Sequence, residues 1–336
     1  MEGLVYGARE LRERGAAEWE ALAADMRRRT GELRGDPADA DWRSLLDELN
    51  ADAPAGPEAM REAYQEATDS ARAFCRERGL VTFPAGEHCD VLPSAPFTRP
   101  MLAVAHYMAP PPFFDGGAAG GPPLDTRRGT FFVPYPPDGS TPEQVHQRML
   151  TNSLNSRWTI AVHEAYPGHH WHLAHIAANL PRPLRFVFSS TYFTEGWGLY
   201  VEDMMRRQGF YADPRHELCQ VDARLFRAAR IVVDTSLHLG EMTIAEATEH
   251  MSTKASLSPE TAAAEVLRYC AWPTQAASYL TGALEIARME REWTAAGRGD
   301  LRAFHDTVAG TGRLPIRLVE RCLADEAGLA NAGLSG

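Results

Sequence analysis

Histidines are concentrated in one short segment of the chain. Five of the twelve lie between His163 and His175, and the residues from His163 to His170 read His-Glu-Ala-Tyr-Pro-Gly-His-His. A neutral imidazole is a good ligand for zinc, and a glutamate next to such a ligand can take a proton from water at the metal. The segment therefore predicts His163 as a metal ligand and Glu164 as a general base.

The spacing of the later histidines differs from that of a regular zinc-binding helix. In a regular α-helix His169, six residues after His163, would lie roughly 120° away from the His163 face, and His170 would lie about 10.5 Å along the axis. Pro167 removes a helical hydrogen bond and clashes with the carbonyl group four residues earlier, so the helix must kink or widen there. We expect His169 to be the second ligand and His170 to support the site or face the substrate. The sequence leaves an exchange of these two roles open.

A third ligand is needed, because two histidines leave zinc short of a protein ligand and a carboxylate on a following helix is a usual completion. Glu195 lies among apolar and aromatic residues and is followed by Gly196 and Gly198, which permit a close approach of helices. A buried carboxylate needs a partner. The predicted cofactor is one Zn²⁺ ion on His163, His169 and Glu195, with another divalent metal as the alternative.

Hydrolysis also needs donors for the oxyanion that develops when water attacks a carbonyl group. The candidates for this catalytic role are His238, Arg268 and Tyr279. Asp234 is four residues before His238, so both lie on one helical face and the carboxylate could orient the imidazole. Gln275 has the same spacing from Tyr279 and is a candidate substrate-binding residue. Packing is an equally good explanation for each of these side chains.

Amphipathic periodicity predicts that helices position most of these residues. The expected helices cover residues 8–33, 41–50, 57–78, 142–165, 170–179, 189–208, 214–240, 244–253, 258–270, 274–295, 301–309 and 315–327. Residues 81–128 are rich in proline and glycine, which predicts a largely irregular segment beside a binding cleft.

A short run of aromatic and β-branched residues at positions 129–135 predicts a strand, and Pro134 favours an edge position for it. An edge strand can bind an extended substrate through backbone hydrogen bonds, and Phe131 in its middle is a candidate substrate contact. The expected fold is mainly α, with a small β-hairpin or short sheet flanking the active-site cleft. We expect a helical segment over residues 1–80 and a catalytic region over residues 81–336, together forming one compact unit.

Composition narrows the classes of partner. The chain has 336 residues and a formal net charge of -11, which argues against nucleic-acid and anionic-membrane partners. The five scattered cysteines include no CxxC pair, so neither a disulfide framework nor a thiolate metal site is indicated. The sequence shows neither the apolar core of a signal peptide nor a membrane-spanning apolar run, and the expected location is cytoplasmic. A homodimer is left open.

The motifs resemble those of the bacterial domain of unknown function 885 family, whose members carry a His-Glu-x-x-Pro-Gly-His segment and a later Glu-Gly-Trp segment. The resemblance implies a gluzincin-like metallopeptidase fold of helices, with zinc on His163, His169 and Glu195 and with Glu164 as the base. Members of that family usually have a larger N-terminal portion, which would wall the substrate cleft. The shorter chain therefore favours a small amide-containing metabolite over a polypeptide.

Together these features predict a zinc-dependent hydrolase that cleaves an amide or peptide bond in a small peptide-like or metabolite substrate. One alternative is an iron enzyme with oxidative or lyase chemistry on the same two histidines and glutamate. Metal analysis and oxygen dependence separate these two enzymes. A third possibility is a binding protein without turnover, although the intact pair of His163 and Glu164 argues against it.

Overall fold

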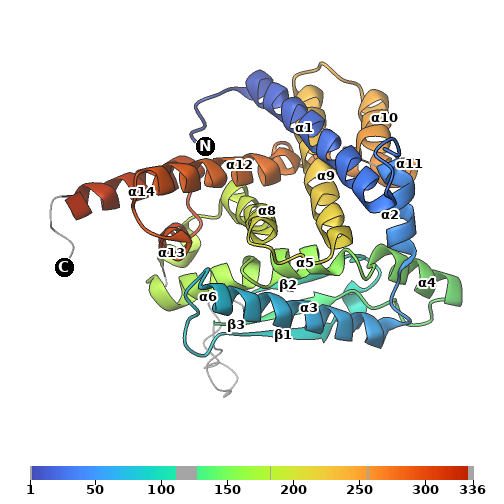
Figure 1. The fold of residues 1–336 in the computed structure, drawn as a ribbon, viewed down its shortest axis with the longest axis horizontal. Helices are drawn as coiled ribbons and strands as arrows, with labels where there is room; N and C mark the ends of the chain where they lie inside the picture. Colours follow the sequence, from blue (N-terminus) through green and yellow to red (C-terminus); the bar gives the residue numbers. More distant parts are fainter. Residues whose placement is uncertain (1, 111–126, 182, 256, 332–336) are drawn as a thin grey trace. The chain divides into compact units, whose positions relative to one another are not determined.

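The computed structural model describes residues 2–110, 127–181, 183–255 and 257–331. Most of these residues are helical, and a three-stranded sheet lies among the helices (Figure 1). The chain divides into two compact units. Unit 1 comprises residues 1–48, 190–288 and 315–317, and unit 2 comprises residues 49–189, 289–314 and 318–336. The mainly helical fold with a short sheet agrees with the prediction from sequence.

Unit 1 is built from long helices that bury small and aromatic side chains. It contains α1 (Ala8–Arg34), α8 (Thr191–Arg207), α9 (Pro214–His238), α10 (Ile244–Lys254), α11 (Pro259–Ala271) and most of α12 (Gln275–Ala295). Helix α1 lies along α9 (Figure 1). Its buried residues recur at helical spacing, and a side chain at Gly15 would lie 2.5 Å from the Ile231 side chain. Close contact of these two helices therefore depends on a small residue in α1.

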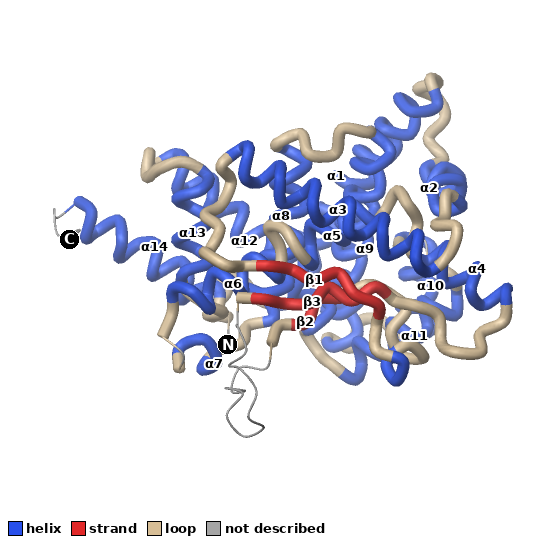
Figure 2. Tube along the Cα trace, turned by 90° about the horizontal axis from the view of Figure 1, so that it is seen from below, coloured by secondary structure: helices blue, strands red, loops and turns tan. Residues whose placement is uncertain are grey.

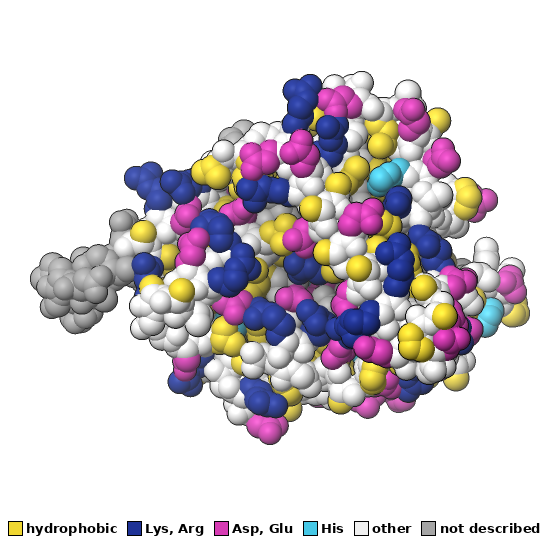
Figure 3. All heavy atoms as spheres, turned by 45° about the horizontal axis from the view of Figure 1, so that its top comes forward, with side chains coloured by type: hydrophobic (Ala, Val, Ile, Leu, Met, Phe, Trp, Pro, Cys, Tyr) yellow, Lys and Arg dark blue, Asp and Glu magenta, His cyan; other side chains and the backbone are white. Residues whose placement is uncertain are grey.

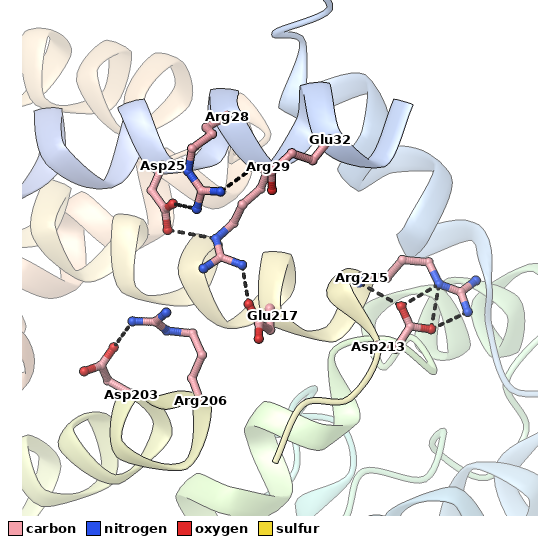
Figure 4. Close-up of polar contacts among 9 residues, drawn as sticks. All are labelled: Asp25, Arg28, Arg29, Glu32, Asp203, Arg206, Asp213, Arg215 and Glu217. Carbon is pink, nitrogen blue, oxygen red and sulfur yellow. Dashed lines mark hydrogen bonds and ion pairs between the residues drawn. The ribbon is translucent and has the colours of Figure 1, made fainter. Parts of the chain in front are cut away.

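Charged side chains also join α1 to α9. The Arg29 guanidinium donates to Asp25 on its own helix at 2.8 Å and to Glu217 on α9 (Figure 4). Arg28, one residue earlier, binds only Asp25 and Glu32 of α1 and is 54% exposed. Arg29 thus links two helices, whereas Arg28 carries a solvated charge, and exposed pairs of that kind contribute little to stability.

Unit 2 combines the sheet with the helices that cover it. It contains α3 (Pro57–Arg78), α4 (Pro142–Thr151), α5 (Arg157–Glu164), α6 (His169–Asn179), α7 (Leu184–Val187), α13 (Leu301–Gly310) and the strands β1 (His88–Pro93), β2 (His106–Met108) and β3 (Arg128–Val133). A short 3₁₀ helix, Pro96–Thr98, follows β1. Helix α3 contacts α5, β1 and β3, and α6 contacts β2, β3 and α13. Two further helices, α2 (Trp42–Ala51) and α14 (Ile316–Asn331), contain residues of both units.

The strand order corrects the edge position predicted for residues 129–135. The order is β1-β3-β2, with β3 parallel to β1 and antiparallel to β2 (Figure 2). Strand β3 is therefore central, and Pro134 follows its last residue, so the missing N–H group breaks no ladder hydrogen bond. Strands β1 and β2 form the edges. Both lie in the segment 81–128 that was expected to be irregular, and β2 is too short to show an alternating pattern.

Two further expectations differ from the structure. The helix expected over residues 142–165 is split into α4 and α5. Asn152 ends α4, because its side-chain amide donates to the Arg148 and Ala103 carbonyl groups and its side-chain oxygen accepts from Tyr64. The division near residue 80 also differs: residues 1–48 belong to unit 1 with α9, whereas α3 belongs to unit 2 with the sheet.

On the face drawn in Figure 3, basic and acidic side chains are intermingled. Among the described residues, no helix is both long enough and apolar enough to cross a membrane.

Candidate metal centre

Helices α5 and α6 bring two histidines and a glutamate together in unit 2. Helix α5 ends at Glu164, and α6 begins at His169 after a break of four residues. Potential ligand atoms of His163, Glu164 and His169 all lie within 4.8 Å of one another. The two imidazole rings are 4.7 Å apart between centroids and nearly perpendicular, at 87°. The predicted break in the helix is therefore present, and it places His169 beside His163.

Gly168 makes this close approach possible. A Cβ atom at position 168 would lie 1.9 Å from the His163 carbonyl oxygen and 2.3 Å from the Val162 carbonyl oxygen. Such distances are far inside van der Waals contact, so a larger residue would push α6 away from the end of α5. Beyond the turn, the Trp171 N–H donates to the Ala165 carbonyl at 3.2 Å. The Pro-Gly pair thus ends one helix and lets the next begin directly against it.

His170 has a different environment from His169. Its side chain is completely buried, its Nδ1 lies 3.3 Å from the Tyr107 hydroxyl, and its Nε2 lies 3.2 Å from a Glu87 carboxylate oxygen. Both ring nitrogens therefore have protein partners. Of the two roles predicted for His170, support of the site fits this geometry, whereas contact with a substrate does not.

The carboxylate of Glu164 is held by the edge strand. Its Oε2 accepts a hydrogen bond from the backbone N–H of Tyr107 on β2 at 2.8 Å. Tyr107 pairs with Phe131 in the register of β2 and β3, so its N–H points away from the sheet at the outer edge of β2. This contact fixes one oxygen of the predicted base.

Glu87 anchors the residues behind the histidines. It accepts hydrogen bonds from Tyr166 at 2.8 Å and from the Arg72 Nε at 2.9 Å, and it also contacts His170. Burial alone would raise the pKa of Glu87, but these hydrogen bonds from His170, Arg72 and Tyr166 together lower it to about 2. Sequence reasoning missed Glu87 because it lies in an irregular segment with no motif around it.

The residues present fit a divalent metal. Zinc binds imidazole nitrogen and carboxylate oxygen at about 2.0–2.2 Å, so two ligands of one ion lie roughly 3–4 Å apart. The separation of at most 4.8 Å among His163, Glu164 and His169 is compatible with two ligands and an adjacent base. Glu195 lies on α8 in unit 1 and is half-buried. The three-ligand set that includes Glu195 stays a prediction.

The glycine after Glu195 has the packing role expected of it. A Cβ atom at Gly196 would lie 2.6 Å from the backbone of Gly282 on α12. Helices α8 and α12 therefore touch through their backbones within unit 1.

The predicted pair of Asp234 and His238 is present on α9. The Nδ1 of His238 lies 3.1 Å from Asp234 Oδ1 and 2.8 Å from the Asp234 carbonyl oxygen. Asp234 is buried and also accepts from the backbone N–H groups of Thr274 and Ala277 at the start of α12. Burial raises the pKa of Asp234. A cavity of about 260 Å³ in unit 1 is lined in part by this pair and by Tyr6. The catalytic role of His238 stays a prediction.

Arg268, Gln275 and Tyr279 belong to one polar cluster of α9, α11 and α12 in unit 1. The Arg268 Nη1 donates to the Gln275 side-chain oxygen at 2.6 Å, and the Gln275 amide donates to the Tyr279 hydroxyl at 3.2 Å. Arg268 also makes a bidentate pair with Glu265 at 2.9 and 3.1 Å. The structure brings the three predicted residues together, but Arg268 and Gln275 already have protein partners.

Arg230 and Tyr269 complete this cluster and were missed from sequence. The Arg230 Nη2 donates to Glu265 at 2.8 Å, and the Tyr269 hydroxyl donates to the same carboxylate at 2.7 Å. Arg230 binds residues 35 and 39 positions away, so no local spacing pointed to it.

One other predicted site residue, Phe131, is buried, and so is His172 in the histidine-rich segment. Phe131 on β3 is fully buried and packs edge-to-face against Tyr64, with centroids 5.4 Å apart. It belongs to the core, so it does not fit the substrate-binding role predicted for it. His172 is also buried, lies 3.1 Å from the Gly312 carbonyl oxygen, and has its pKa lowered to about 3 by burial.

Comparisons with known proteins identify relatives without assigning an activity. The family model described as "Bacterial protein of unknown function (DUF885)" matches residues 1–323. A putative lipoprotein from Colwellia psychrerythraea is 24% identical, with a TM-score of 0.79, and the match covers 95% of this chain and 52% of that one. A putative lipoprotein of unknown function from Shewanella oneidensis is 20% identical, with a TM-score of 0.82, and the match covers 95% and 57%. The chain thus spans about half the length of these structures. No curated protein matches the sequence.

Proposed function

We propose an activity for this chain, which belongs to the bacterial family of unknown function DUF885, from the chemistry of its histidine site: metal-dependent hydrolysis of an amide or peptide bond. The observation that carries the proposal is the convergence of His163, Glu164 and His169. Two imidazoles can hold a divalent ion, and the carboxylate that follows the first of them directly can act as a base. We propose zinc as the metal, Glu195 as the third ligand and a gluzincin-like architecture for the fold.

Glu164 is suited to move a proton. With Oε2 held by the Tyr107 N–H, its other oxygen, Oε1, is the atom that receives a proton from water. The water oxygen then adds to the carbonyl carbon, the bond from carbon to nitrogen breaks, and the proton passes from Glu164 to the leaving amine. A divalent ion, when bound, supplies the Lewis acidity that acidifies water and polarises the carbonyl group.

The outer edge of strand β2 is an argument for an extended, peptide-like substrate. The edge role first predicted for residues 129–135 passes to β2, because β3 is paired on both sides. The N–H and C=O groups of one strand residue point to the same side, so the Tyr107 carbonyl lies on the outer edge that also holds Glu164. It is placed to accept a hydrogen bond from a substrate N–H group, as edge strands do when they bind peptides.

The decisive experiment combines metal analysis with hydrolysis of dipeptides and small amides, with and without a chelator. We expect one equivalent of a divalent metal, and activity that the chelator removes. Glu164→Gln should keep the metal and lose about 10²- to 10⁴-fold in turnover, the usual contribution of a general base.

The matched control is Glu143→Gln, which changes an exposed glutamate on α4 and should leave turnover unchanged. Full activity of Glu164→Gln would refute the base. Purified protein that takes up no divalent metal would refute the centre.

A further inference from the structure

The polar cluster of unit 1 contains more positive charge than its own carboxylate neutralises. Glu265 is paired with both Arg230 and Arg268. Arg227, one turn before Arg230 on α9, has its guanidinium 5.9 Å from the centre of the Tyr279 ring, and that of Arg230 is 5.2 Å from the same ring. Two guanidinium groups therefore pair with one carboxylate, and a third lies beside the aromatic ring of the same cluster.

Arg227 has no carboxylate of its own within ion-pair distance in the part of the chain that the structure describes. Its Nη1 donates to the Ala223 carbonyl on the same helix at 3.1 Å, and its buried Nε has no acceptor among the residues that the structure describes. A half-buried arginine normally finds acceptors for its donors, because an unmet charged donor is costly. Asp222 also lies near Arg227: burial raises its pKa to about 6, so it is mostly ionised at pH 7, and with Glu265 it cancels two of the three positive charges.

Other donors beside Arg227 are also unused. The Tyr279 hydroxyl accepts a hydrogen bond from Gln275, which leaves its own proton available. Arg230 uses Nε for Tyr269 and Nη2 for Glu265, which leaves its Nη1 without a protein acceptor among the described residues. Two arginines and Tyr279 thus have hydrogen-bond donors without acceptors in the described part of the chain, close to the Tyr279 ring.

We propose that unit 1 contains a carboxylate-binding site formed by Arg227, Arg230 and Tyr279. The planar guanidinium fork matches the two oxygens of a carboxylate, and a tyrosine hydroxyl adds a third donor. The surplus of about one positive charge suits a monoanion better than a phosphate dianion. Tyr279 then binds the carboxylate of the ligand and does not stabilise the oxyanion, the role for which it was first a candidate. The inference concerns unit 1 alone and does not depend on the hydrolase proposal.

The test is equilibrium binding, by calorimetry on the full chain, of three probes: N-acetyl-L-alanine, its amide and inorganic phosphate. We expect the acid to bind and the amide to bind at least about tenfold more weakly, because the amide cannot make the charge-assisted hydrogen bonds. Phosphate should bind more weakly than the acid. Equal binding of acid and amide, or tighter binding of phosphate, would overturn the assignment.

Substitutions place the binding at Arg227. Arg227→Gln should weaken binding of the acid by at least about tenfold and leave binding of the amide unchanged. Arg28→Gln removes an equal charge at an exposed position of unit 1 and should change neither. Arg227→Lys keeps the charge, loses the fork and should give an intermediate affinity, which serves as the test if the glutamine variant does not fold. A carboxylate bound only at a metal would be unaffected by either substitution at Arg227, and that result would refute the site.

Discussion

In each compact unit, a glutamate with a strongly lowered pKa lies against arginine and tyrosine side chains. Glu87 in unit 2 is bonded by Arg72, Tyr166 and His170, and Glu265 in unit 1 is bonded by Arg230, Arg268 and Tyr269. In both cases burial alone would raise the pKa of the carboxyl group. In both cases hydrogen bonds and nearby positive charge lower it to about 2 instead.

The two clusters differ in exposure and in the donors that they leave unused. The Glu87 side chain is 1% exposed and pairs with Arg72 and, at 3.9 Å, with Arg76. Burial lowers the pKa of its partner His170, which favours a neutral imidazole beside these charges. The Glu265 side chain is 20% exposed and pairs with Arg230 and Arg268, and Arg227 lies beside the Tyr279 ring of the same cluster. The same pairing of a glutamate with arginine and tyrosine therefore gives a buried network behind the histidines in unit 2. In unit 1 it gives a partly exposed cluster with unused donors.

The largest expected effect follows from removing the buried charge of Glu87. Glu87→Gln should lower the free energy of unfolding by about 3 kcal/mol, because it removes the buried carboxylate charge with which Arg72, whose side chain is 29% exposed, pairs. Urea denaturation measures this change. The control Glu66→Gln removes an exposed partner of Arg157, 62% accessible, and should cost less than about 1 kcal/mol.

Equal costs of these two variants would mean that the Glu87 network adds no more than a surface pair. The same Glu87→Gln protein should also bind the divalent metal more weakly, since His170 directly follows the predicted ligand His169.

Acid should weaken both clusters over the same range of pH. The ordinary pKa of a glutamate is 4.5, and each of these carboxyl groups has a folded-state pKa near 2. Their contribution to stability is therefore complete above pH 4.5 and is lost as pH falls to about 2. For Glu87 it amounts to about 3 kcal/mol. Denaturation at several pH values should show a flatter decline for Glu87→Gln than for the wild type, and parallel curves would contradict the assigned pKa.

Local features of the candidate site could be predicted from sequence. The break between α5 and α6 follows from Pro167 and Gly168, which act on the few residues around them. His169 rather than His170 lies beside His163, and its role as the second ligand stays a prediction. Most helix boundaries follow from periodicity and from capping residues close to the helix ends.

Features that depend on distant residues could not be predicted. The N–H of Tyr107 donates to Glu164, which is 57 positions away in the chain. Because almost every residue has a backbone N–H group, the residue type at position 107 does not predict this contact. Strand β3 looked like an edge because of Pro134, yet its position depends on β1 and β2, whose sequences are too short or too irregular to identify. Glu87 and His170 are 83 positions apart in the chain, so the sequence around either residue does not predict their contact.

The smallest expected effect concerns the carboxylate of unit 1. Glu265→Gln should lower the free energy of unfolding by only about 1–2 kcal/mol, because its pairs with Arg230 and Arg268 are partly solvated. The variant releases donors and adds to the surplus charge, so N-acetyl-L-alanine should bind a few-fold more tightly, as calorimetry would measure. Glu87→Gln should not change that affinity, since Glu87 and its partners belong to unit 2 and not to the carboxylate site of unit 1. Tighter binding in both variants would show a nonspecific response to net charge. Tighter binding in Glu265→Gln alone would show that the arginine left without a partner in unit 1 binds the carboxylate.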